Sequence, residues 1–336
     1  MHKLLRFLPA AALAALPLFS TAADFSIQEE PGKHIDILQD GKIVGRYMTE
    51  HDTSTPEKRL ETYKPYLHVF DAEGKAPITK GPGGEFTHHR GILIGWMKIG
   101  VNGKTYDRWH MKGGDQVHEK LLAQDPAHGS ITSQVDWMGE GSDVIIQEER
   151  TMTFLPAKAP AYAVVDFTSK LKAVAGDTTF DGDPEHAGLQ FRPANEVDRA
   201  KGVYLYPKQD AKPHKDFDYP WFAETFSLNN QDYSVVYLNH PANPKEARIS
   251  AYRDYGRFGA FFKTSVKKDE VLTVKARFLI VKGAMPAVDV IQQAWNDYAG
   301  KNEPVPPTTT LPSEHSAPKE KKPAPAKVKA EAGKQS

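Results

Sequence analysis

The chain has 336 residues, with 43 Lys and Arg balanced by 43 Asp and Glu, and it contains no cysteine. The lack of cysteine excludes disulfides, thiolate zinc sites and cysteine nucleophiles. A formal net charge of zero gives no electrostatic reason to expect nucleic acid as a partner. No run reaches the roughly 18–20 apolar residues that cross a bilayer, so we expect no membrane span.

The first residues match the pattern of a signal peptide. Lys3 and Arg6 supply positive charge, a short apolar core runs from Leu8 to Phe19, and small residues follow up to Ala23. This pattern is typical of export, with a buried first helix as the alternative. We therefore predict a signal peptide over residues 1–23 and a mature protein that is periplasmic or extracellular.

Strand patterns fill residues 24–300, which we interpret as one domain. A helical pattern is convincing only near the end, where Pro286 suits a first turn and Gly300 suits a helix end. The polar residues 51–64 are expected to be irregular. The body therefore predicts an all-β fold, a large antiparallel β-sandwich with one C-terminal helix over 286–298. The main expected strands are 35–38, 43–47, 66–70, 92–99, 117–122, 130–137, 144–154, 162–174, 187–191, 203–206, 234–238, 258–262 and 271–281.

The last segment, residues 301–336, is rich in Pro, Ala and Lys and has almost no large apolar side chains. Such a segment buries too little surface to offset its chain entropy, so we predict a disordered tail. Its excess of Lys over Glu leaves two interpretations open, a solvated spacer or a contact with acidic polymers.

A block of polar side chains precedes the expected strand 92–99. His88, His89 and Arg90 follow the glycine-rich turn 81–84. These side chains are costly to bury and have no evident packing use, so they are candidate site residues. Adjacent side chains diverge on a strand, so we expect His89 to face a cleft while His88 packs or caps the turn.

A second candidate wall lies on the expected strand 187–191. Side chains alternate along a strand, which places His186, Gln190 and Arg192 on one face around Gly188, with apolar residues on the other. Imidazole, amide and guanidinium groups together suit hydrogen bonding to hydroxyls or carboxylates. A plain solvent-exposed face is the alternative.

Charged residues also interrupt the apolar face of strand 144–154. Glu148 and Arg150 share that face with apolar side chains. They form either a structural ion pair or part of a polar cleft. Downstream, a rigid loop with His240 and Asn243, followed by Arg253 and Tyr255, is interpreted as a cleft edge, with scattered surface residues as the alternative.

The histidines do not follow a compact metal-binding spacing. No His-Glu-x-x-His motif or similar pattern is present. A divalent metal bound through imidazole and carboxylate groups from separate strands stays open. The histidines considered as site candidates are His88, His89, His110, His118, His186 and His240.

Several of these motifs, in this order, resemble exported bacterial proteins of the PmoA-like family, over roughly residues 60–282. The elements are Pro65-Tyr66, the block 88–91, Glu148-x-Arg150, the strand 187–192, the loop 240–244 and the segment 253–256. The resemblance implies a supersandwich-like fold, similar in outline to sugar mutarotases and polysaccharide lyases, and a link to carbohydrate utilisation. The membrane subunit of methane monooxygenase with that name is excluded, because the chain lacks a span.

The leading hypothesis is an exported enzyme that acts on a saccharide or polyhydroxy compound by isomerisation, elimination or hydrolysis. His89, His186 or His240 would supply acid–base chemistry, and Glu148 would orient one of them. A non-catalytic carbohydrate-binding module, with Trp109, Trp137 and Trp221 as platforms, and a metal-dependent oxidase or oxygenase are the alternatives. The residues expected to contact the small-molecule or glycan substrate are His88, Arg90, Arg150, Gln190, Arg192, Asn243, Arg253 and Tyr255.

Overall fold

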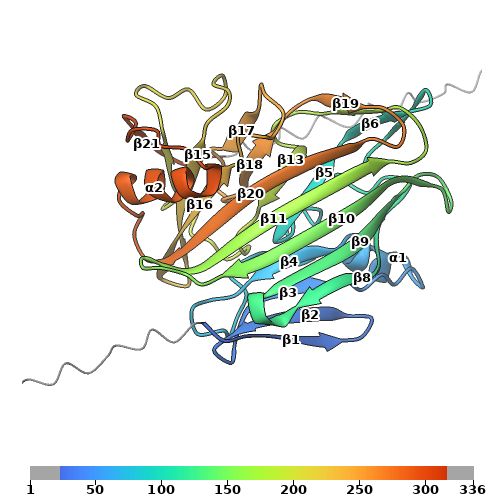
Figure 1. Cartoon of the computed structure of the whole chain (residues 1–336), viewed down its shortest axis with the longest axis horizontal. Coiled ribbons are helices and arrows are strands. Elements are labelled where there is room, and N and C mark those ends of the chain that lie inside the picture. Colours follow the sequence, from blue (N-terminus) through green and yellow to red (C-terminus); the bar gives the residue numbers. More distant parts are fainter. Residues whose placement is uncertain (1–22, 316–336) are drawn as a thin grey trace, which may run out of the picture.

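The computed structural model describes residues 23–315 and confirms the all-β, sandwich-like fold. Two large antiparallel sheets face each other, and a smaller third sheet lies at one end (Figure 1). The expected signal peptide lies outside the described residues except for Ala23. Within the described part of the chain, no helix is long and apolar enough to cross a membrane.

The first large sheet has 8 strands and carries most of the candidate site. Its central strands β5, β13 and β18 are neighbours although they are far apart in sequence. In sheet order the strands are β1 (Phe25–Glu30), β2 (His34–Gln39), β3 (Lys42–Met48), β4 (Tyr66–Val69), β5 (Ile92–Trp96), β13 (Ala187–Phe191), β18 (Phe258–Phe261) and β17 (Arg248–Ala251).

The second large sheet has 9 strands, and the small sheet has 4. The long strands of the second sheet cross the front of Figure 1 diagonally. In sheet order the second sheet contains β21 (Thr309–Pro312), β14 (Val203–Tyr206), β15 (Trp221–Leu228), β16 (Gln231–Asn239), β20 (Val271–Lys282), β11 (Ala161–Ala173), β10 (Val144–Leu155), β9 (Ser130–Met138) and β8 (Gln116–Asp125). The small sheet contains β19 (Thr264–Val266), β12 (Thr178–Asp181), β6 (Lys98–Val101) and β7 (Lys104–Tyr106).

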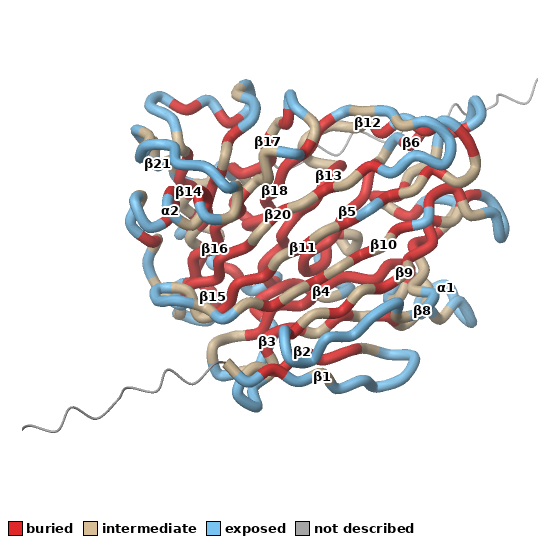
Figure 2. Tube along the Cα trace, viewed as in Figure 1, coloured by how far each residue is buried: buried red, intermediate tan, exposed pale blue. Residues whose placement is uncertain are grey.

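The hydrophobic core lies between the two large sheets. Alternating residues of β5, Ile92, Ile94 and Trp96, join this core, whereas Leu93 packs in a separate cluster with Tyr66 and Trp109. Buried segments run along the facing strands of both sheets in Figure 2, and exposed segments lie at the periphery. Leu93 is nevertheless fully buried, because loops cover the outer face of the first sheet there.

The helices differ from expectation in one respect. The C-terminal helix α2 (Val288–Ala299) forms as predicted and packs its Ile291 and Trp295 on the outer face of the second sheet. The segment expected to be irregular contains a short helix, α1 (Pro56–Thr62). Its start carries a local signal, because Thr55 accepts a hydrogen bond from the Lys58 amide.

Several strand expectations also change, and the short strands β12, β17 and β19 were not expected. The apolar run 92–99 is divided at Met97 into β5 and β6, which belong to different sheets. Strand β15 was not expected, because most residues on both of its faces are buried and its sequence therefore lacks a polar–apolar alternation.

The prediction of disorder from residue 301 onward is wrong for residues 301–315. Strand β21 pairs with β14 at the edge of the second sheet, with Thr309 opposite Tyr206 and Pro312 opposite Val203. Backbone pairing with an existing edge orders this segment although its side chains bury little apolar surface. The remaining tail, residues 316–336, lies outside the described residues.

Candidate active site

Four histidine rings gather on the outer face of the first sheet. The ring centroid of His88 lies 4.3 Å from that of His89 and 4.5 Å from that of His110. His110 lies 5.2 Å from His186 by the same measure. The expected meeting of the block at residue 88 with His186 therefore occurs, and both His88 and His89 take part rather than His89 alone. We call these four residues the histidine cluster.

The strand order brings these residues together. The loops that precede β5, β13 and β18 carry the histidine pair, His186 and Tyr255, respectively. The Tyr255 ring lies 6.1 Å from His89 and is stacked with it. Gly91 allows the chain to turn into β5, since a Cβ there would lie 2.2 Å from the Leu67 carbonyl oxygen.

Strand β13 supplies the floor under these loops. Gln190 and Arg192 are fully buried, and so is Phe191 between them, which rules out a plain solvent-exposed face. Gly188 does not leave room for a ligand, because its missing Cβ would lie 1.9 Å from the Ala260 carbonyl oxygen of β18. The neighbouring strand occupies that space.

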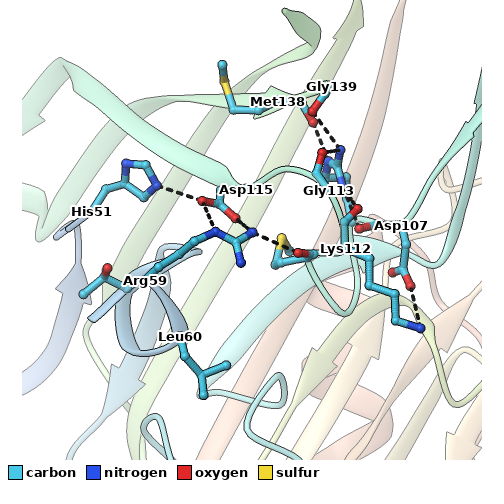
Figure 3. A network of polar contacts seen from close by, with 12 residues as sticks. His51, Arg59, Leu60, Asp107, Lys112, Gly113, Asp115, Met138 and Gly139 are labelled. Atoms are coloured by element: carbon cyan, nitrogen blue, oxygen red, sulfur yellow. Dashed lines mark hydrogen bonds and ion pairs between the residues drawn. The ribbon is translucent and has the colours of Figure 1, made fainter. Parts of the chain in front are cut away.

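The loop 107–115, which carries His110, is held by buried polar contacts. Arg108 is fully buried, and each guanidinium nitrogen donates to backbone: Nε to Met138, Nη1 to Asp107 and Lys112, and Nη2 to Gly113 and Gly139. Asp115 then anchors the loop to α1 by accepting from Arg59 and contacting His51 (Figure 3). This frame fixes where His110 stands.

Two histidines of the cluster have an aspartate partner three residues earlier. Nδ1 of His110 lies 2.8 Å from Asp107 Oδ2, and Nδ1 of His186 lies 2.8 Å from Asp183 Oδ1. Hydrogen bonding to His186 lowers the pKa of Asp183. Burial raises the pKa of Asp107, but hydrogen bonds from His110 outweigh that effect and leave it lowered. An ionised aspartate places the proton on Nδ1 and leaves Nε2 to exchange protons.

The other two histidines have buried nitrogens without a partner. Within residues 23–315, Nε2 of His88 and both ring nitrogens of His89 make no hydrogen bond. Burial lowers the pKa of His88 to about 2, with Lys64 adding to the effect. Burial and then the charge of Arg257 hold the pKa of His89 well below its ordinary value. Both rings are therefore neutral at neutral pH, and each can donate and accept one hydrogen bond.

Other expected site residues have structural partners instead. Arg90 is fully buried and donates to the carbonyls of Leu60, Glu61 and Thr87, so it closes the end of α1 rather than meeting a substrate. Arg253 pairs with Glu185 near the cluster.

Glu148 and Arg150 form an ion pair inside the sandwich. Both are fully buried, and Arg150 donates from Nε and Nη2 to the two carboxylate oxygens at 2.9 and 2.8 Å. The carboxylate also accepts from Trp137 and Ser169. The structural interpretation of this pair is therefore the one that the fold supports. Among residues 23–315, Glu148 forms its hydrogen bonds and ion pair with Trp137, Arg150 and Ser169 and with no histidine, so its expected role in orienting one is corrected.

His240 and Asn243 lie on the opposite side of the molecule. His240 packs against Tyr298 of α2, on the outer face of the second sheet. Asn243 bonds to Asn239 and to the backbone of Lys275. A pocket of about 590 Å³ between α2 and this sheet is separate from the histidine cluster. The residues from His240 to Arg253 therefore do not form the single cleft edge that we expected.

The aromatic platforms of the binding-module hypothesis are absent from the surface. Trp109, Trp137 and Trp221 are fully buried. Trp109 instead lies beside His89, with ring centroids 5.7 Å apart.

His110 is among the candidate histidines, but no sequence pattern singled out Asp107 or Asp183 as site residues. An Asp-x-x-His spacing does mark both aspartate–histidine pairs. The same spacing recurs at Asp125 and His128, which form an exposed pair on the surface. The spacing alone therefore finds the contact but cannot locate a site.

The arrangement does not favour the divalent metal that the sequence leaves open. Among the described residues, no group of three or more His, Cys, Asp or Glu side chains is arranged to hold a metal ion. The histidine rings contact one another by their faces and edges. We derive no step that involves a metal.

The fold has distant likenesses among solved structures. A heparan sulfate lyase mutant from Pedobacter heparinus is 7% identical with a TM-score of 0.40, and the match covers 78% of this chain but only 37% of the lyase. A galactose mutarotase-like protein from Clostridium acetobutylicum is 9% identical with a TM-score of 0.36, covering 77% and 99% of the two chains. A galactose mutarotase related enzyme from Lactobacillus acidophilus is 7% identical with a TM-score of 0.33, covering 78% and 100%. These likenesses are too distant to assign an activity.

The family comparison corrects the resemblance drawn from the sequence motifs. No PmoA family model matches the chain, so that resemblance is wrong. No curated protein sequence matches it either. Several of the motifs that suggested it, including Glu148-x-Arg150 and the loop 240–244, serve the sandwich itself or its opposite face. Residues 34–296 match the model of a family of unknown function, DUF6807. The chain belongs to that family.

Proposed function

We propose that this protein is an enzyme that transfers protons on a saccharide or related polyhydroxy compound at the histidine cluster. The observation that carries this proposal is the pair of adjacent imidazoles, His110 and His186, each bonded through Nδ1 to an aspartate. An aspartate-supported imidazole is a general acid or base, and two of them side by side can serve as one of each.

The proposed chemistry follows from one imidazole acting as a base and the other as an acid. One imidazole Nε2 accepts a proton from a substrate hydroxyl or carbon, and the other returns a proton elsewhere on the same molecule. This step is shared by isomerisation and by elimination of a glycosidic oxygen. The neutral His88 and His89 rings and the Trp109 indole offer hydrogen-bonding groups that could hold hydroxyls, because their buried nitrogens lack partners within the described residues.

The test compares matched variants of two kinds of aspartate–histidine pair. His110→Gln and His186→Gln, and Asp107→Asn and Asp183→Asn, are assayed for turnover on a panel of mono- and oligosaccharides. We expect each histidine substitution to lower kcat by roughly 10²–10⁴. His128→Gln and Asp125→Asn remove the same local contact at the exposed pair and should leave turnover unchanged. Equal activity in the two sets of variants would refute the proposal.

Export remains part of the proposal, since the N-terminal signal pattern supports it. Cell fractionation tests it: the mature chain should be found in the periplasm or the medium with residues 1–22 or 1–23 removed. Retention of the uncleaved chain in the cytoplasm would contradict it.

A further inference from the structure

Beside the histidine cluster lie two buried arginines whose hydrogen-bonding capacity is not filled. Arg192 and Arg257 are both fully buried, and both flank the Tyr255 ring, at 5.0 and 5.8 Å from its centroid. Within the described residues, Nε of each makes no hydrogen bond. Their remaining nitrogens donate to neutral oxygens: Arg192 to the Pro193 and Tyr255 carbonyls and to Asn195, Arg257 to Gln190 and to the Tyr255 hydroxyl.

Other buried arginines of this protein show what a structural role requires. Arg108 donates to backbone carbonyls from every guanidinium nitrogen. Arg150 has a fully buried carboxylate in bidentate contact. Burying a guanidinium without such partners is costly. Arg192 and Arg257 therefore lack hydrogen-bond partners of the kind that Arg108 and Arg150 have.

The nearby carboxyl groups do not supply the missing hydrogen bonds of Arg192 and Arg257. Glu224 is buried, burial raises its pKa well above the ordinary value, and within the described residues its Oε2 makes no hydrogen bond. Glu185 bonds to Arg253 and comes only within 4.0 Å of Arg257. The carboxylates of the two aspartate–histidine pairs are taken up by their imidazoles.

The unfilled groups around the cluster are mainly donors. Within residues 23–315, the Arg192 and Arg257 Nε–H groups and the Trp109 indole N–H lack acceptors, and each neutral histidine of the pair 88–89 adds one N–H. The Lys64 ammonium, only 1% exposed, donates to the Trp109 carbonyl at 2.9 Å. A ligand that completes this site must bring acceptor oxygens, and an oxyanion brings the most.

We propose that the histidine cluster binds a ligand that carries an oxyanion group, which Arg257 and Arg192 hold against His89 and Tyr255. On the proposed function, on which this inference rests, the substrate is an acidic saccharide. Its anionic group is a carboxylate, as in a uronic acid, or a sulfate or phosphate ester. Arginine suits this task because its planar fork matches the oxygens of such groups.

The experiment measures binding, not turnover, by calorimetry on the full chain at low salt. The ligands are three matched pairs: glucuronate and glucose, galacturonate and galactose, and a sulfated or phosphorylated hexose and its parent sugar. We expect at least one anionic member to bind about tenfold or more tightly than its neutral partner, since charge-assisted hydrogen bonds exceed neutral ones in strength. The pair that shows the ratio identifies the carboxylate, sulfate or phosphate as the ligand group. Equal affinities within every pair, or no binding by any member, would overturn the inference.

Variants separate the arginines from general electrostatics. Arg257→Gln should abolish the anionic preference, and Arg257→Lys should restore part of it, because it keeps the charge and loses the fork. Arg277→Gln, which removes a cation paired with Asp166 on the second sheet, should keep the full preference. A preference that survives Arg257→Gln in a folded sample overturns the assignment. If that variant does not fold, raising the salt concentration on the native protein decides: the ratio must fall.

Binding and turnover assays distinguish a failure of the oxyanion site from a failure of the proposed function. Anionic preference without turnover would leave the oxyanion site standing and remove the catalytic role of the cluster. Turnover of neutral saccharides that depends on His110 and His186, with no anionic preference, would support the catalytic role and remove the oxyanion site.

Discussion

The ion pair of Glu148 and Arg150 gives the sharpest prediction about what holds the sandwich together. Substituting Glu148→Gln removes the carboxylate charge that Arg150 contacts and leaves its guanidinium with neutral acceptors such as the Pro65 carbonyl. Both side chains are fully buried, so water cannot replace the lost partner. Breaking a buried pair in this way costs about 3–5 kcal/mol.

That cost is a large share of a domain's total stability of roughly 5–15 kcal/mol. At about 2–4 °C for each kcal/mol in proteins of comparable size, the melting temperature should fall by roughly 6–20 °C. Urea unfolding followed by tryptophan fluorescence measures the free energy directly. Removing the second charge as well, in Glu148→Gln with Arg150→Met, should cost about 2–3 kcal/mol less than the sum of the two single changes, because no stranded charge remains.

A neighbouring residue provides the control. Glu149 pairs with Lys170 at 2.6 Å, but both side chains are more than a third exposed. Glu149→Gln should therefore change the free energy of unfolding by less than about 1 kcal/mol. If Glu148→Gln is no worse than Glu149→Gln, or if the two changes in the buried pair are additive, the pair is not the structural element described above.

Three further predictions concern acid stability, the second face and a glycine. Folding lowers the pKa values of His88 and His89, so below pH 6.5 the unfolded chain binds more protons than the folded chain. The free energy of unfolding is therefore highest above the unfolded pKa near 6.5. It falls as the pH drops below that value, by up to about 1.4 kcal/mol per pH unit for each ring. Denaturation between pH 7.5 and 4.5 should show this slope, and His89→Asn should flatten it; an unchanged slope would contradict the burial of the neutral ring. His240→Ala should leave saccharide binding and turnover unaltered, because the ring packs on α2, and a loss of activity in a folded sample would place it in the site after all. Gly188→Ala should lower the free energy of unfolding by more than about 2 kcal/mol, since its φ is +85 and its Cβ would lie 1.9 Å from a backbone oxygen. Gly41→Ala is the control: its φ is +75 but the space around it is open, so it should cost only about 1 kcal/mol. Equal losses of stability in thermal melts of the two variants would refute the close approach at Gly188.

Local sequence patterns predicted the strand character of the chain and which side chains share a face. Alternation with a period of two placed Gln190 and Arg192 opposite the apolar residues of β13, and it placed Glu148 and Arg150 together on the inner face of β10. These assignments are local, because successive side chains of a strand point to opposite sides whatever the strand packs against.

Which of those faces belongs to a site depends on how the sheets and loops pack. The inner face of β10 is sealed by the opposite sheet, so its charges pair with each other. The outer face of β13 lies under loops that the sheet order gathers, since β5, β13 and β18 are neighbours despite their distance in sequence. That order joins His89, His110 and His186, leaves His240 on the other side, and buries Arg257 with the Glu185 carboxylate 4.0 Å away. Strand pairing depends on the packing of the whole chain, and no local pattern encodes it.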